Sequence, residues 1–140
     1  MSIGAFLVFG FLGYAFFLYL FPQKNIDEIV PPSVWGNIIV TEPVPYQEVG
    51  FPLVLTGQAR VFESVFQYRL LDDAGNVLAQ NYAMANALDV GLYGDFSLEI
   101  VYQEPKSVQG VLEVFSYSAK DGSEQDMVRI PVRFLTRVRE

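Results

Sequence analysis

The sequence predicts an all-β sandwich of about seven strands, preceded by one transmembrane α-helix, and three observations support this prediction. The first 21 residues contain apolar and aromatic side chains without a charge. After residue 37, short runs rich in Val, Ile, Leu, Tyr and Phe are separated by Gly, Pro, Asn and Asp. In several of these runs apolar and polar residues alternate with a period of two, which indicates strands with one buried face.

The N-terminal stretch from Ile3 to Phe21 is uncharged over 19 residues. As a helix rising about 1.5 Å per residue, it nearly spans a hydrocarbon core of about 30 Å. A cleaved signal peptide is the alternative, but no basic region precedes the stretch and no small-residue pair ends it. We therefore predict a retained membrane anchor at residues 1–21. Lys24 lies just after it, and charge alone does not fix which side of the membrane the domain faces.

The remaining chain divides into a stalk, a domain and a tail. Residues 22–36 contain Pro31 and Pro32, which are stiff and cannot continue a helix, so we predict a short stalk there. The sandwich is predicted at residues 37–135 and a basic tail at 136–140. The expected strands lie at 38–41, 52–56, 64–72, 76–83, 95–102, 110–118 and 126–135.

Alternation and turn residues indicate how these strands are arranged. In the fifth run Phe96 and Ile100 share one face, and the opposite face is polar. Gly75 suits a hairpin between the third and fourth strands, and Gly122 suits a similar turn between the sixth and seventh. Pro131 predicts an edge position or a bulge in the last strand, because proline cannot donate to a ladder. Since no interval between strands contains a convincing amphipathic helix, two packed antiparallel sheets are expected.

Six motifs follow one another in the order IIVTEP at 38–43, PLVLTGQA at 52–59, FES at 62–64, RLLDDAGNVLA at 69–79, GDF at 94–96 and VRIPVRF at 128–134. From Ile38 to Phe134 this pattern resembles the immunoglobulin-like domain of bacterial spore germination and sporulation proteins, which often stands beside GerMN-type domains. The resemblance implies an immunoglobulin-like sandwich on the outer side of a bacterial membrane. It also implies a binding or assembly role, and it offers no catalytic residues to carry over.

The composition argues against several classes of function. The net charge of −7 and the pI near 4.5 disfavour binding to a nucleic acid backbone. The chain has no cysteine, so it has neither a disulfide nor a thiolate metal site. It has no histidine, which removes Ser-His-Asp and Cys-His activation and histidine-ligated zinc. We therefore predict no enzyme activity and no cofactor.

Carboxylates are the remaining candidates for chemistry. A pair about 5 to 10 Å apart could hydrolyse a glycosidic bond without histidine, and Glu63, Glu99 and Glu113 are the candidates for this least favoured function. Glu99 and Glu113 stand at polar positions of alternating strands and are expected to face solvent. Glu63 stands between Phe62 and Val65, so a structural tie to backbone N–H groups or an arginine is its preferred role. Ligand contact and plain exposure to solvent are the alternatives for Glu63.

Four aspartates, Asp72, Asp73, Asp121 and Asp126, lie near expected turns, where carboxylate oxygens could bind calcium. Their spacing matches no recognisable calcium loop. Because aspartate is also a residue that tight turns favour, turn roles are expected and no metal is predicted.

The segment from Asn81 to Gly94 is longer than a hairpin needs and contains several apolar side chains. Loops on rigid sandwiches often carry recognition, so this segment is a candidate binding loop. The favoured interpretation is a crossover between the sheets whose apolar side chains join the core. The candidate partner-contact residues are Phe62, Glu63, Tyr82, Met84, Leu92 and Tyr93.

Together these features predict a non-catalytic binding or assembly module of the bacterial cell envelope. We expect it to be anchored in the cytoplasmic membrane with its domain on the extracytoplasmic side, and to contact an envelope protein or a cell-wall glycan but no nucleic acid. The alternative is a structural module that self-associates through exposed edge strands. Pro131, Arg129 and Arg133 count against that alternative, because prolines and charges protect edges.

Overall fold

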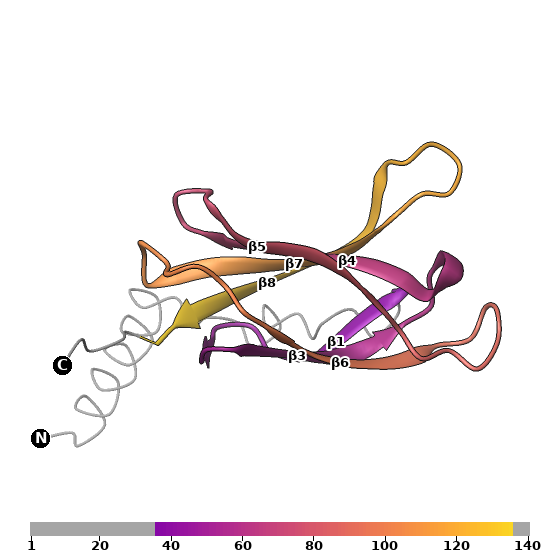
Figure 1. Cartoon of the computed structure of the whole chain (residues 1–140), viewed down its shortest axis with the longest axis horizontal. Coiled ribbons are helices and arrows are strands. Elements are labelled where there is room, and N and C mark those ends of the chain that lie inside the picture. Colours follow the sequence, from indigo (N-terminus) through magenta and orange to yellow (C-terminus); the bar gives the residue numbers. More distant parts are fainter. Residues whose placement is uncertain (1–35, 136–140) are drawn as a thin grey trace, which may run out of the picture. The chain divides into compact units, whose positions relative to one another are not determined.

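The computed structural model describes residues 36–135, which form two packed β-sheets (Figure 1). The predicted anchor, stalk residues 22–35 and the predicted tail at 136–140 lie outside the described residues. Within residues 36–135 no helix is long and apolar enough to cross a membrane. Membrane anchoring therefore stays a prediction.

One sheet has three strands in the order β1-β3-β6, and the other has five in the order β2-β8-β7-β4-β5. A single turn of 3-10 helix, η2, connects β3 to β4. The bounds are β1 (Ile38–Glu42), β2 (Gln47–Val49), β3 (Leu53–Ala59), η2 (Phe62–Ser64), β4 (Val65–Asp72), β5 (Val77–Met84), β6 (Gly94–Ile100), β7 (Gln109–Tyr117) and β8 (Glu124–Phe134).

The seven predicted strands are all present, but the prediction missed β2, which pairs in parallel with β8. The sheets are therefore not wholly antiparallel. β2 has only three residues, which is too short to show an alternating pattern. It also covers the last part of β8, so Pro131 does not mark the edge of the sheet.

β8 accommodates Pro131 because the nitrogen and the carbonyl group of this residue both point away from β7. Its carbonyl accepts a hydrogen bond from the Tyr46 N–H at 2.7 Å. The nitrogen and carbonyl of one strand residue point to the same side, so the proline nitrogen points toward the β2 side as well. The β7–β8 ladder therefore loses no hydrogen bond at this position.

The core lies between the two sheets and follows the predicted alternation. In β6, Phe96 and Ile100 are buried while Asp95 and Glu99 are exposed. The Phe66 and Phe96 rings have centroids 4.4 Å apart, so β6 lies across from β4. The largest fully buried side chains are Phe66, Phe115, Ile38, Leu53, Leu55, Leu70, Ile100, Leu112, Ile130, Val40, Val114 and Val132.

The two ends of the sandwich carry different loops. We call the end where the described chain begins the Asn37 end; it also carries η2, the loop 85–93 and the β7–β8 turn, at the right of Figure 1. We call the opposite end the Leu135 end; it carries the β4–β5 turn and the segment 101–108. Most of the residues that the sequence singled out for partner contact lie at the Asn37 end.

Candidate interaction surface

A network of hydrogen bonds fixes the start of the domain at Asn37. The Arg60 side chain donates to the Asn37 amide oxygen from Nε at 3.3 Å and from Nη2 at 3.1 Å. The Asn37 Nδ2 donates to Asp126 Oδ1 at 3.0 Å, and the Ser116 hydroxyl lies 3.0 Å from the other Asp126 oxygen. Because Arg60 follows β3 and Asp126 belongs to β8, this network ties the first strand to both sheets.

Tyr93 connects the base of the loop 85–93 to the same network. Its hydroxyl donates to the Gly36 carbonyl at 2.9 Å, and the Arg60 guanidinium lies 4.8 Å from the centroid of its ring. Tyr93 is 37% exposed. These contacts give it a structural role, and its contact with a partner stays a prediction.

The tip of the loop, which we define as residues 88–92, presents aliphatic side chains to solvent. Leu88 is 93% exposed, Val90 98% and Leu92 52%. The Leu92 N–H bonds to the Asp89 carbonyl at 3.3 Å, and Gly91 takes a φ of 80°, so the tip is a tight turn. A single exposed aliphatic residue is ordinary, but three within five residues mark a candidate contact surface.

The segment from Asn81 to Gly94 was predicted to cross between the sheets and to place its apolar side chains in the core, and only the first part of this prediction is confirmed. The chain does pass from β5 in the five-stranded sheet to β6 in the three-stranded sheet. However, Tyr82, Met84 and Leu92 are all more than half exposed and do not join the core. Their positions explain this: Tyr82 and Met84 lie on the outer face of β5, and Leu92 lies in the loop tip.

η2 places two more candidates at the Asn37 end. Phe62 is 66% exposed, and Glu63 is exposed with a φ of 54°. The structural tie expected for Glu63 is wrong, because its side chain makes no hydrogen bond or ion pair with residues 36–135. The physical reason is the left-handed turn at Glu63 and Ser64, which directs the carboxylate into solvent.

The candidates therefore fall on two surfaces. Phe62, Glu63, Leu92 and Tyr93 lie at the Asn37 end, whereas Tyr82 and Met84 lie on the outer face of the edge strand β5. The sequence analysis did not single out Leu88 and Val90, which are the most exposed apolar side chains among the described residues. The sequence LDVGL at 88–92 contains three aliphatic residues that could have indicated a contact surface. However, their alternation is equally typical of a strand with one buried face.

Glu113 was expected to face solvent, and the structure corrects this. It lies on the outer face of β7 but is only 6% exposed, because arginine side chains from both neighbouring strands lie across it. Arg69 Nε lies 2.7 Å from one carboxylate oxygen and Arg129 Nε 2.9 Å from the other. Burial raises the pKa of Glu113, but hydrogen bonds from Arg69 and Arg129 outweigh it, so the net pKa is lowered.

The candidate carboxylates are not brought together as a hydrolytic pair. Glu113 lies on the outer face of the five-stranded sheet and Glu99 on the outer face of the three-stranded sheet. Packed sheets are about 10 Å apart, and the two side chains project in opposite directions from them. Glu63 belongs to neither face, since it lies in η2.

Asp72, Asp73 and Asp121 lie at turns as expected, whereas Asp126 lies inside β8, where it takes a φ of 57°. Asp72 accepts hydrogen bonds from the Ala74 and Asn76 N–H groups at 3.0 and 2.9 Å and from the Asn76 side chain at 2.9 Å. The side-chain bond from Asn76 is the main cause that lowers the Asp72 pKa. Asp121 accepts from the N–H and hydroxyl of Ser123 at 3.0 and 2.6 Å. Within residues 36–135 no group of three or more acidic residues could hold a metal ion.

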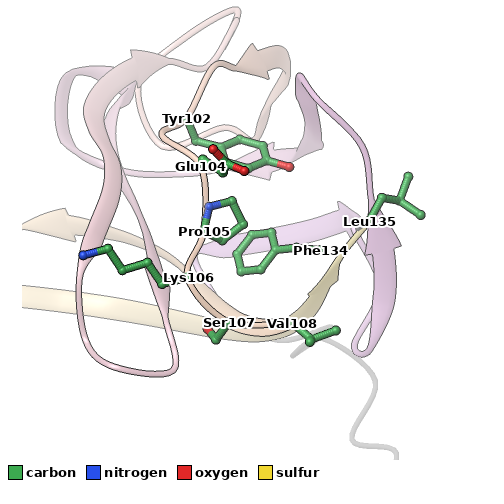
Figure 2. A pocket seen from close by; sticks show the side chains of 8 residues that line it. All are labelled: Tyr102, Glu104, Pro105, Lys106, Ser107, Val108, Phe134 and Leu135. Atoms are coloured by element: carbon green, nitrogen blue, oxygen red, sulfur yellow. The ribbon is translucent and has the colours of Figure 1, made fainter. Parts of the chain in front are cut away.

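A small pocket of about 240 Å³ opens at the Leu135 end (Figure 2). The Phe134 ring lies beside Pro105 and below Tyr102, whose hydroxyl donates to the Gly50 carbonyl at 2.8 Å. The pocket is smaller than the roughly 300 to 1,000 Å³ of most small-molecule sites. Its lining is Tyr102, Glu104, Pro105, Lys106, Ser107, Val108, Phe134 and Leu135, and none of these is a candidate from the sequence.

Two packed β-sheets with the core between them are the architecture that immunoglobulin-like domains share with other β-sandwiches. The family model described as the immunoglobulin-like domain of bacterial spore germination (Gmad2) matches residues 37–123. This match covers more than half of the chain, and the chain belongs to that family. The matched region ends before β8, so the motif at 128–134 lies outside it. Comparisons with curated proteins and with solved structures found no match.

Proposed function

We propose that this protein is a non-catalytic contact module of the bacterial cell envelope. In this proposal the apolar stretch at residues 1–21 holds the chain in the cytoplasmic membrane, and the sandwich stands on the extracytoplasmic side. Membership of a spore germination domain family supports the assignment to a non-catalytic module. The uncharged length of the N-terminal stretch supports the anchor.

The exposed loop tip is the observation that carries the contact role. Leu88 and Val90 are almost fully exposed, and Phe62 is exposed at the same end of the sandwich. The network at Asn37 ties the base of this loop to the body of the domain, so the tip is presented on a fixed support. Aliphatic side chains favour an apolar protein surface as the partner over a glycan.

The expected affinity follows from the area available. Burying a side chain such as Leu88 or Phe62 stabilises a complex by about 1.5 to 3 kcal/mol. Three such side chains supply roughly 5 to 9 kcal/mol, from which the cost of association must be subtracted. We therefore expect a transient contact, which the proposed membrane anchor would assist by confining both partners to one surface.

The contact role is tested by a photoreactive amino acid placed at Val90 of the full chain in cells. Irradiation should produce one adduct of defined mass at Val90, and Leu88→Ser should reduce its yield. The matched control is the same amino acid at Ser97, which is exposed on the outer face of β6. Equal adducts at Val90 and Ser97, or none at Val90, would contradict the proposal.

A further inference from the structure

The four edge strands of the two sheets differ in how well they are protected. Edges expose unpaired N–H and C=O groups, and proteins protect them with short strands, bulges, prolines or charges. β2 has three residues, β1 has five with a shift in register between Val40 and Glu42, and β6 carries Asp95 and Glu99. β5 has eight residues, none of which is charged or proline. The β4–β5 register also shifts, between Leu70 and Leu71, but residues 79–84 of β5 pair regularly. The part of β8 that β2 does not cover carries charged residues. Among the described edges, residues 79–84 of β5 therefore have the least protection.

The hydrogen bonds of β5 show which backbone groups face outward. The Ala85 N–H bonds to the Ser64 carbonyl at 2.9 Å, so residue 85 faces β4. Because successive strand residues alternate, residues 79, 81 and 83 also face β4. Gln80, Tyr82 and Met84 therefore direct their N–H and C=O groups away from the sheet.

The free part of the edge has clear limits. The Leu78 carbonyl already accepts the Gln103 N–H at 3.0 Å, and the Asn86 N–H already bonds to the Asp95 carbonyl at 2.8 Å. Between these positions, the Tyr82 N–H bonds to the side chain of its own neighbour, Asn81, at 2.9 Å. The edge available for pairing therefore extends over residues 80–84.

We propose that two copies of this chain pair through β5 in antiparallel orientation, with Tyr82 on the two-fold axis. This register pairs Tyr82 with Tyr82 of the second copy and Gln80 with Met84. Every outward N–H and C=O of these three residues then has a partner, once Asn81 releases the Tyr82 N–H. Moving the register by two residues in either direction would place Leu78 or Asn86 opposite a free residue, and fewer pairs would form because the Leu78 carbonyl and the Asn86 N–H are already occupied.

The side chains on this edge are also compatible with self-pairing. Tyr82 and Met84 are 63% and 64% exposed and lie on the outer face of the five-stranded sheet, opposite Gln67 and Val65. Pairing would place the two Tyr82 rings side by side and Met84 against Gln80 of the second copy. Cross-strand aromatic pairs of this kind stabilise a sheet.

Charge repulsion between the copies is small at this edge. β5 has no charged residue, and the acidic residues of β6 lie across from β4, as the contact of Phe66 with Phe96 shows. The two β6 strands would then be about three strand spacings apart, or about 14 Å. This exceeds the Debye length of about 8 Å at physiological ionic strength.

The dimer does not depend on the proposed membrane anchor, but it is compatible with one. Antiparallel pairing leaves the two Asn37 ends at opposite ends of the dimer. The 14 residues at 22–35 can span at most about 50 Å. An eight-residue strand such as β5 is only about 27 Å long. Both copies could therefore be tethered to one membrane surface.

The register is tested by disulfide formation between two full-length variants, Asn81→Cys and Ala83→Cys, mixed in detergent and oxidised. In the proposed dimer Asn81 stands opposite Ala83 of the second copy, with Cα atoms about 4.5 Å apart, which suits a disulfide. Each variant alone should not cross-link, because identical residues are then offset by two positions, at about 7 to 8 Å. The matched control is the pair Ser97→Cys and Glu99→Cys on β6, which should not cross-link.

A second variant separates dimerisation from folding. Tyr82→Pro removes an outward N–H and places a ring at the axis, yet it leaves the β4–β5 hydrogen bonds in place. Wild type should sediment as a dimer and Tyr82→Pro as a monomer with the same far-ultraviolet circular dichroism. The proposal would be overturned if the wild-type chain stays monomeric. It would also be overturned if the mixture of Asn81→Cys and Ala83→Cys forms no more disulfide-linked dimer than the β6 control pair.

Discussion

Glu113 is a buried carboxylate that two guanidinium groups hold in place on the outer face of the five-stranded sheet. Arg69 lies closest, and it also bonds to Glu124 at 3.1 Å and covers the Phe115 ring at 4.9 Å. Phe115 is fully buried although it lies on the outer face, because these side chains cover it. The outer face of this sheet is therefore a packed layer at its centre.

The two arginines should contribute unequally to stability. The Arg69 side chain is 20% exposed and that of Arg129 is 68% exposed. Arg69→Ala would leave Glu113 partly unpaired and uncover Phe115, so we expect a loss of about 2 to 3 kcal/mol in the free energy of unfolding. Arg129→Ala should cost less than about 1 kcal/mol. Urea denaturation measures both, and equal losses would contradict this reading of the layer.

Residues such as Glu63 and Glu113 show where prediction from the sequence fails. Alternation correctly places Glu113 on an outer face, but it does not report which long side chains from neighbouring strands fold across that face. Glu63 has apolar neighbours, yet the left-handed turn at η2 directs it outward. Strand register buries Glu113 and backbone conformation exposes Glu63, and a local sequence pattern contains neither.

At the scale of elements, β3 pairs closely on both sides. Gly57 stands opposite Val40 in β1 and Phe96 in β6. A Cβ atom at Gly57 would overlap the Ile39 carbonyl and press on the Phe96 ring. Glycine is therefore required here by the close approach of the neighbouring backbone and not by an unusual φ.

Gly57→Ala should accordingly destabilise the domain by about 2 to 4 kcal/mol, since overpacking in a core displaces the backbone. Gly50→Ala is the matched control, because a Cβ there would have no neighbour closer than 4.0 Å. Thermal unfolding of the two variants measures the difference. A Gly57→Ala variant as stable as Gly50→Ala would show that β1 and β3 are not packed as described.

The strands themselves were predictable because each long run has one buried face, as in β6 and β8. β2 was not predictable, since its three residues gain their strand geometry only by pairing with β8. The edge status of β5 was not predictable either. Which strands are edges depends on the order of the strands in the sheet, and short-range alternation does not encode this order. For this reason Pro131 suggested β8 as an edge strand, whereas the edges of that sheet are β2 and β5.

At the scale of the whole domain, the two proposed contacts use different surfaces. The loop tip projects from the Asn37 end, whereas the β5 edge runs along the side of the sandwich (Figure 1). A dimer through β5 would leave the loop tips of both copies exposed. A paired molecule could then present two contact surfaces at once, which would raise its avidity for a partner.

The claim that the sandwich faces the outside of the cell is tested most directly by cysteine accessibility. The chain has no native cysteine, and Ser123 is exposed in the β7–β8 turn, so Ser123→Cys places one reactive thiol on the domain. We expect a membrane-impermeant thiol reagent to label this variant in intact cells, while a cytosolic thiol protein stays unlabelled. Labelling that occurs only after lysis would place the domain in the cytoplasm and contradict the proposed role in the envelope.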